Sequence, residues 1–147
     1  AQKGTPKFNF PEPQIQGLNF SFSGLKTAIL YFLKRGVKEN PNFISENMED
    51  ICASVQDRIV TILMKKLRKA ARQTGVKEVA IAGGVSANSG LRSALKTWGE
   101  KEGWKTYIPA FQFCTDNAGM IAVTGYYKYL GEDFAEHDIV PKARMAF

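Results

Sequence analysis

Apolar residues recur every three or four positions over most of the chain, which is the spacing of amphipathic helices. The pattern predicts helices over about 24–36, 45–74, 88–101 and 115–130. Acidic residues near the start of the longest helix and basic residues near its end suit the helix dipole, and Gly75 ends it. Ser23 and Thr115 are the expected N-caps of the first and last helices.

Two short runs interrupt the helical spacing and predict strands over about 76–82 and 104–109. Each is followed by a predicted helix, so the order strand–helix–strand–helix predicts parallel pairing. Residues 1–22 are rich in Pro and aromatic residues, and we expect an extended arm that ends in a short strand at Leu18–Phe22. Residues 23–147 contain the predicted helices and the other two strands. The fold class is therefore α/β. Two or three strands are too few for a parallel sheet covered on both faces, which predicts missing strands or self-association.

Composition narrows the class of protein. The chain has 147 residues, 44% of them apolar and 23% charged, which fits one globular domain. A net charge of +6 favours polyanionic partners such as nucleic acid. Two cysteines are too few for a disulfide framework, so we expect a reducing, cytoplasmic setting. No apolar run reaches the roughly 18 residues of a membrane span, so we expect no membrane partner.

The segment IAGGVSANSGLR, residues 81–92, joins a predicted buried strand to a predicted helix. Gly83 and Gly84 lack a Cβ and let a ligand approach the backbone, and the following helix start suits a phosphate. The Asn88 amide could contact that ligand. The alternative is that the glycines only form a tight turn and Asn88 only caps the helix.

The segment FCTDNAG, residues 113–119, follows the second predicted strand. Both helix starts therefore lie at the carboxyl edge of one sheet, where open α/β sheets bind ligands. Asp116 is then a carboxylate beside a phosphate site, which is typical of a divalent metal site. The alternative is that Asp116 only complements the helix dipole.

Three other features have weaker readings. Lys26 and Thr27 within FSFSGLKTA resemble the end of a P-loop, but the preceding glycine spacing is absent. His137, the single histidine, cannot make a His-rich metal site. A basic cluster could contact RNA phosphates, although such a cluster is more often the solvated end of a helix; its residues are Lys65, Lys66, Arg68, Lys69 and Arg72.

In the order FSFSGLKTA, a long helix, IAGGVSANSGLR and CTDNAGMIA, the chain resembles the bacterial TsaD family from about Phe8 to its end. These are the tRNA threonylcarbamoyladenosine transferases, once labelled O-sialoglycoprotein endopeptidases or glycoproteases. The resemblance implies an actin-like fold, as in sugar kinases, heat-shock ATPases and ribonuclease H. It also implies transfer of threonylcarbamoyl from threonylcarbamoyl-adenylate to the adenosine next to the anticodon, in tRNAs that read codons starting with A.

The same resemblance implies roles for particular residues. Asn88 would contact the adenylate, Gly83 and Gly84 would line the nucleotide site, and Asp116 would bind iron or zinc. The family's histidine metal ligands belong to an HxxxH motif that this chain lacks. We therefore expect a C-terminal lobe fragment with an incomplete sheet, inactive by itself. The implied partners are a smaller paralogue and an ATPase subunit.

Two other functions stay open at this point. A kinase or O-carbamoyltransferase of the same superfamily would use the glycine loop for another acceptor. The other is a non-catalytic nucleotide-binding or partner module. A purely structural paralogue need not keep Asp116 or the GGVSAN loop, and both are present. A peptidase has no support, because neither a protease nucleophile arrangement nor an HExxH motif is evident.

Overall fold

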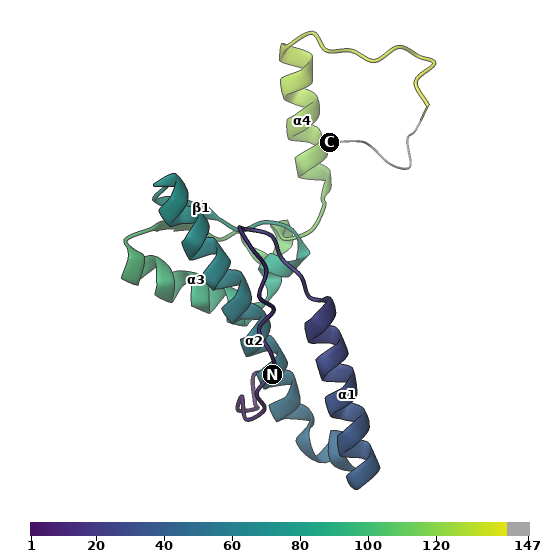
Figure 1. Ribbon diagram of the computed structural model, residues 1–147. Coiled ribbons are helices and arrows are strands. Elements are labelled where there is room, and N and C mark those ends of the chain that lie inside the picture. The colour runs from purple at the N-terminus through teal and green to yellow at the C-terminus, as the bar shows by residue number, and fades with distance from the viewer. Residues whose placement is uncertain (141–147) are drawn as a thin grey trace.

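The computed structural model describes residues 1–140, and its elements form a helical body from which one helix projects (Figure 1). In chain order they are α1 (Ser23–Glu39), α2 (Phe43–Thr74), β1 (Glu78–Ala80), the 3-10 turn η1 (Gly84–Ala87), α3 (Ser89–Glu102), β2 (Lys105–Tyr107), the 3-10 turn η2 (Phe111–Phe113) and α4 (Ala118–Leu130). The coarse prediction of a helix-rich α/β chain is confirmed. None of the helices within residues 1–140 is both long and apolar enough to span a membrane.

The central element is α2, which takes part in both hydrophobic clusters of the body. One cluster joins Met64 of α2 to Val79 of β1, Leu95 of α3 and Trp104, which lies between α3 and β2. The other joins α2 to α1 and the N-terminal arm, with Phe10, Leu25 and Ile62 buried at its centre. Because both clusters lie on the same long helix, α2 sets the position of the sheet relative to α1.

The sheet has two strands, which pair in parallel as predicted. Val79 of β1 lies opposite Thr106 of β2, and each strand is three residues long. The ladder continues at both ends, where Lys105 N donates to Lys77 O and Ile81 N donates to Tyr107 O at 2.8 and 3.1 Å. The strands are shorter than the predicted 76–82 and 104–109, because within residues 1–140 each strand has a neighbour on one edge only.

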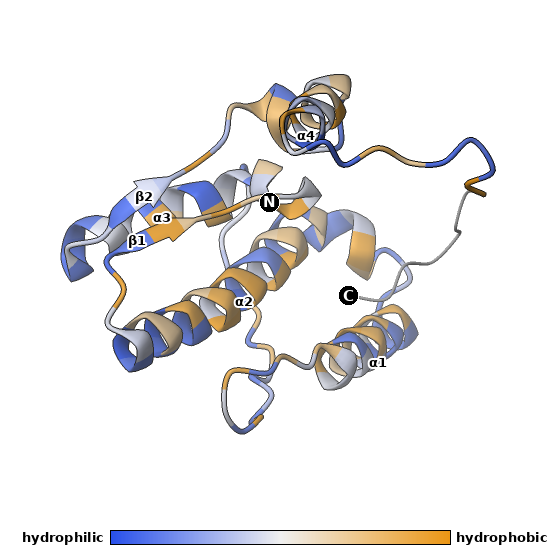
Figure 2. Cartoon of the chain, turned by 90° about the horizontal axis from the view of Figure 1, so that it is seen from above, coloured by the Kyte–Doolittle hydropathy of each residue, from blue (hydrophilic) through white to orange (hydrophobic). Residues whose placement is uncertain are grey.

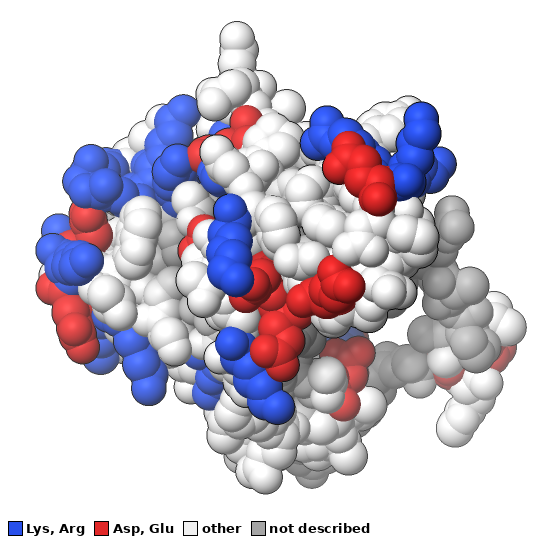
Figure 3. Space-filling model, turned by 90° about the horizontal axis from the view of Figure 1, so that it is seen from below, with Lys and Arg blue, Asp and Glu red and all other residues white. Residues whose placement is uncertain are grey.

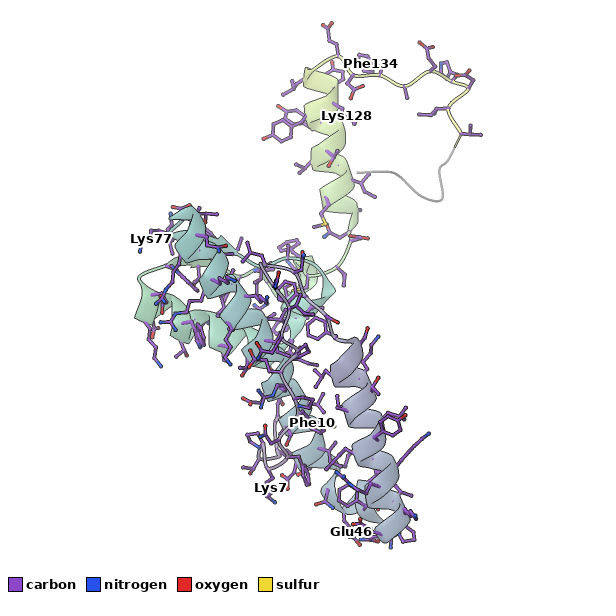
Figure 4. The ribbon with its side chains drawn as sticks, viewed as in Figure 1. Lys7, Phe10, Glu46, Lys77, Lys128 and Phe134 are labelled. Atoms are coloured by element: carbon purple, nitrogen blue, oxygen red, sulfur yellow. The ribbon has the colours of Figure 1, made fainter. Side chains whose placement is uncertain are left out.

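The N-terminal arm lies along α2 and is tied to it by hydrogen bonds. Thr5 N donates to Asp50 Oδ1 at 2.8 Å, and Phe8 N donates to Ser54 Oγ at 2.9 Å. Phe8 also packs against Phe32 of α1, with ring centroids 5.0 Å apart. Figure 4 shows Lys7 and Phe10 of the arm beside α2. The strand predicted at Leu18–Phe22 is absent, because no other strand within residues 1–140 lies beside it.

Helix α4 projects from the body (Figure 1). Its thirteen residues are all exposed, and its sequence is mostly apolar (Figure 2). Ile121 is 75% exposed and Tyr127 is 67% exposed. The apolar stripe that predicted this helix therefore has no covering element within residues 1–140.

Both predicted N-caps are wrong. Phe22 occupies the cap position of α1 and makes no side-chain capping bond, and Ser23 is the first helical residue. The carbonyl of Ser23 instead accepts from Thr27 Oγ1 at 3.1 Å. The cap of α4 is Asn117 rather than Thr115, because Asn117 Oδ1 accepts from Met120 N at 3.2 Å. Asp116 consequently precedes α4 instead of lying in its first turn.

Candidate nucleotide and metal site

The carboxyl ends of β1 and β2 lead into the two segments that the sequence singles out. After β1 the chain passes through Gly83 into η1 and then α3, and after β2 it passes through η2 into α4. Because the strands are parallel, both connections leave the same edge of the sheet. This edge is where we place the candidate site.

The two glycines of the first segment differ in their backbone geometry. Gly83 has φ 77° and ψ 173°, a conformation that is essentially open to glycine alone. Its carbonyl accepts from Ser86 N at 3.0 Å and from the buried Ser86 Oγ at 2.7 Å, which closes the turn. Gly84 has no positive φ, and a Cβ there would meet nothing within 4 Å. The turn therefore explains Gly83 and leaves Gly84 open to another role.

Asn88 caps α3 and also contacts α2. Its Oδ1 accepts from Leu91 N at 2.9 Å, and its Nδ2 donates to Gln56 Oε1 at 3.0 Å. A Cβ on Gly90 would lie 2.7 Å from Gln56 Nε2, so the glycine makes room for this pair. Asn88 therefore does cap the helix, as the alternative interpretation held. Capping does not use the whole amide, because one of its N–H groups has no partner within the described residues. Gln56 lies 32 residues away in the sequence, and no motif signals it.

An apolar groove of about 480 Å³ runs between α2 and the GGVSAN loop. The amides of Gln56 and Asn88 are the polar side chains of its wall, and Val85 of the loop is 65% exposed. The apolar lining includes Ile51, Val55, Ile59, Val60, Leu63 and Leu91. A mostly apolar groove with a few convergent polar groups is the usual form of a small-molecule site.

Arg92 joins the two segments of the site, and sequence reasoning missed it. Its NH1 donates to Ser86 O at 3.0 Å in the first segment, and its NH2 donates to Pro109 O at 2.8 Å in the second. The guanidinium also lies 4.4 Å from the centre of the Phe111 ring. The planar, forked guanidinium suits two carbonyls and an aromatic face at once. Arg92 therefore holds the β2–α4 connection beside the GGVSAN loop.

Asp116 is exposed at the start of α4 and lines an open hollow of about 490 Å³ along that helix. Asn117 and Lys128 border the same hollow. Among residues 1–140, no hydrogen bond or ion pair joins Asp116 to Gly83, Gly84 or Asn88. The structure brings the two segments together through Arg92, but it leaves the Asp116 carboxylate open to solvent.

Asp116 can supply one metal ligand and no more. Within the described residues no group of three His, Cys, Asp or Glu side chains could hold a metal ion. The exposed carboxylate of Asp116 has no partner among residues 1–140 and is available to a metal, whereas His137 lies in the C-terminal segment after α4. Among the described residues, Asp116 could therefore supply one ligand to a metal ion, and no complete metal site is formed.

Comparison with known proteins decides the family. The family model described as tRNA N6-adenosine threonylcarbamoyltransferase, TsaD, matches residues 1–123. The chain belongs to this family. It is 55% identical to a tRNA N6-adenosine threonylcarbamoyltransferase from Christiangramia forsetii over all of this chain and 44% of the relative. Proteins of the same name from Cytophaga hutchinsonii and Porphyromonas gingivalis are 54% and 50% identical over 99% of this chain and 43% of each relative.

The chain spans less than half the length of these relatives. The matched residues 1–123 include the GGVSAN loop, Arg92 and Asp116. Both segments of the candidate site are thus part of the region that defines the family, whereas the second half of α4 lies beyond it. The resemblance found in the sequence motifs is confirmed.

Proposed function

We propose that this chain is part of a transferase that moves a threonylcarbamoyl group from threonylcarbamoyl-adenylate to a tRNA adenosine next to the anticodon. The observation that carries the proposal is family membership together with the geometry of the sheet edge. The two family segments leave the same edge, and Arg92 ties them together. The acceptor is the amino group of that adenosine, in tRNAs reading codons that start with A.

In this proposal the GGVSAN loop contacts the adenylate. The groove beside it offers apolar walls for a base, and the Asn88 amide has an N–H left to donate to a ribose or phosphate oxygen. Gly84, whose Cβ position is open, lets the ligand approach the backbone. Neither Asn88 nor Asp116 acts as a nucleophile, and both position the substrate.

Asp116 is proposed as one ligand of an iron or zinc ion, with histidine ligands from outside this chain. When bound, such an ion would supply Lewis-acid chemistry toward the threonylcarbamoyl carbonyl. In this proposal Asp116 would hold the ion just before the start of α4, in the segment that Arg92 ties to the GGVSAN loop. Its exposure, without a partner among residues 1–140, supports this assignment.

The wider context belongs to the same proposal. We place the chain in one lobe of an actin-like fold, in which a second lobe completes the nucleotide cleft and supplies the histidines. The enzyme would act in the cytoplasm with a smaller paralogue and an ATPase subunit. Because the described residues form no complete metal site, we expect the chain alone to be inactive. Transfer activity by residues 1–147 alone would contradict that expectation.

The metal assignment is tested in the full-length enzyme with Asp116→Ala. We expect loss of bound metal and of transfer to tRNA, because one of the charged ligands is gone. Asp133→Ala is the matched control, since Asp133 is another exposed carboxylate near α4 and pairs with Lys128. Metal content by mass spectrometry and transfer are measured for both. Unchanged metal in Asp116→Ala would refute the assignment.

The adenylate contact is tested with Asn88→Ser, which separates binding from capping. Serine also caps helices, so the variant keeps an acceptor for Leu91 N while it removes the amide donors. We expect weaker adenylate binding with metal retained, and only a small fall in melting temperature from the lost hydrogen bond to Gln56. Wild-type adenylate affinity in this variant would reduce Asn88 to a structural cap.

A further inference from the structure

Four cations of α2 surround an open hollow on the outer face of that helix. The hollow has a volume of about 380 Å³, and its lining residues are Lys65, Arg68, Lys69, Arg72 and Gln73. The cations are spaced by three and four residues, so they lie on one face and extend along about 10 Å of helix. We call these cations, together with the adjacent Lys66, the basic ridge; its residues are Lys65, Lys66, Arg68, Lys69 and Arg72.

The contacts of the basic ridge leave it strongly positive. Glu12 is shared between Lys65 and Arg58, at 2.5 and 3.7 Å. Glu102 is shared between Arg68 and Arg72, at 2.7 and 3.3 Å. The bonds of Lys66 go to Ile15 O and Gly17 O, at 2.7 and 2.9 Å. Carbonyl oxygens carry no net charge, so Lys66 is held in place without being neutralised.

The acidic partners lie beneath the cations rather than in front of them. The side chains of Lys65 and Arg72 are 53% and 62% exposed. Those of Glu12 and Glu102 are 26% and 17% exposed. The carboxylates therefore fix the orientation of the cations while the positive groups face solvent. Figure 3 shows Lys and Arg side chains along the side of the molecule where α2 and α3 end.

The basic ridge lies away from the candidate nucleotide site on the same helix. Gln56, which contacts Asn88, precedes Lys69 by thirteen residues, or about 20 Å of helix. Figure 4 shows Lys77, just beyond the end of α2, at the opposite end of the body from Glu46 near its start. A small nucleotide cannot reach from the groove to the ridge, but a tRNA is a polyanion long enough to contact both.

We infer that the basic ridge binds the phosphate backbone of the tRNA whose adenosine is modified at the groove. This inference rests on the proposed function for the identity of the RNA. Lys and Arg that neutralise phosphates release counterions, so such contacts supply affinity and position rather than sequence recognition. The competing explanation is structural: the cations would serve only to form ion pairs with Glu102 and to bind the N-terminal arm.

The test is a matched pair of charge reversals in this chain. Lys69→Glu/Arg72→Glu alters the ridge and spares the Lys65–Glu12 and Lys66–Gly17 contacts of the arm. It removes one longer arm contact, from Lys69 Nζ to Gly17 O at 3.4 Å, so the melting curve is measured beside the binding. Arg35→Glu/Lys38→Glu is the control, because it makes the same change of charge on the exposed face of α1. Binding of unmodified tRNA is measured by fluorescence anisotropy at several salt concentrations, and melting is followed by circular dichroism.

We expect the ridge variant to bind tRNA at least about tenfold more weakly, with the slope of log K against log salt reduced by about 2. The tRNA affinity of the control should stay within about twofold of the wild type. Lys69→Arg/Arg72→Lys should keep wild-type affinity, because contacts to phosphates depend on charge rather than on shape. Equal weakening by ridge and control variants would overturn the inference. So would lower stability without a change in slope, or binding to anionic phospholipid vesicles in place of tRNA.

The same measurements separate this inference from the proposed function. If the full-length enzyme fails to modify tRNA while the ridge variant still loses affinity, the function is wrong and the ridge remains an RNA surface. If the enzyme transfers threonylcarbamoyl and the ridge variant retains wild-type affinity and slope, the function stands and the ridge inference is wrong.

Discussion

The body and α4 differ in what surrounds their apolar side chains, although the sequence pattern is similar in both. Leu95 of α3 is 0% exposed and Met64 of α2 is 1% exposed, whereas Ile121 of α4 is 75% exposed. An amphipathic spacing thus indicates a helix but does not name the surface that covers it. Helices in proteins gain most of their stability from packing, and no element within residues 1–140 supplies that packing for α4.

The largest expected effect is a difference in the free energy of unfolding between a variant in the body and a variant in α4. Leu95→Ala should lower the free energy of unfolding by about 2–5 kcal/mol, because it leaves a cavity in the body. Ile121→Ala should change it by less than about 0.5 kcal/mol, because the removed atoms already face water. Urea titrations followed by tryptophan fluorescence measure both.

A large loss of stability in Ile121→Ala would contradict this comparison and would mean that α4 is packed in solution. Repeating the titration at several protein concentrations then identifies the partner. A midpoint that rises with concentration would indicate a second copy of the chain, as the incomplete sheet predicts. A midpoint independent of concentration would point to residues of the same chain.

The body was largely predictable from sequence because its helical apolar stripes are long and a glycine marks the end of the longest helix. The stripe from Ile44 to Ala70 and Gly75 after it predict α2, and Gly75 indeed has φ 74° at its end. The parallel pairing followed from the order of elements alone. The strand at Leu18–Phe22 was predicted wrongly, because a short apolar run does not reveal whether a neighbouring strand exists.

The candidate site was predictable only in part. The positions of Gly83, Asn88 and Asp116 between a strand and a helix follow from the predicted order of elements, and their functional roles stay predictions. Gln56 and Arg92 are not found, because their contacts join positions far apart in sequence. Long-range contacts of this kind depend on how the elements pack, so the spacing of residues in the sequence does not predict them. The structure adds them as the residues that hold the site together.

Arg92 gives the second prediction, because it links the body to the segment from which α4 departs. Arg92→Ala should lower the free energy of unfolding by about 1–3 kcal/mol, since it leaves the carbonyls of Ser86 and Pro109 without their donor. Hydrogen exchange of residues 110–117 should become faster. Arg35→Ala, an exposed arginine of α1, is the control and should alter neither. Unchanged exchange in Arg92→Ala would remove Arg92 from this role.

The two asparagine caps allow a matched comparison of smaller size. Asn88 caps α3 inside the body, and Asn117 caps α4 outside it. Replacing an N-cap asparagine by alanine costs about 1 kcal/mol of helix stability. Asn88→Ala should therefore shift the unfolding midpoint of the whole body. Asn117→Ala should reduce the helicity of α4 and leave that midpoint in place. Equal midpoint shifts would mean that α4 unfolds together with the body.

The smallest expected effect concerns the contacts of Thr5 and Lys7 in the arm with Asp50 of α2, which we call the clamp. Lys7 donates to the Asp50 carboxylate, and together with the N–H of Thr5 it holds the pKa of Asp50 below its ordinary value of 3.8. A carboxyl with a lowered pKa stabilises the fold above its unfolded-state pKa, and this contribution is lost as the pH falls through the folded-state pKa. Asp50→Asn should be slightly less stable than the wild type at pH 7.

That difference should shrink as the pH falls below 3.8, because the wild-type carboxyl then takes up its proton. Asp133→Asn is the control from the other region, where Lys128 and Asp133 form an exposed ion pair. Exposed pairs contribute little, so this variant should match the wild type at neutral pH. Thermal melts between pH 7 and pH 3 measure both variants. A difference between Asp50→Asn and the wild type that grows toward acid would show that the arm is held by its aromatic contacts and not by the clamp.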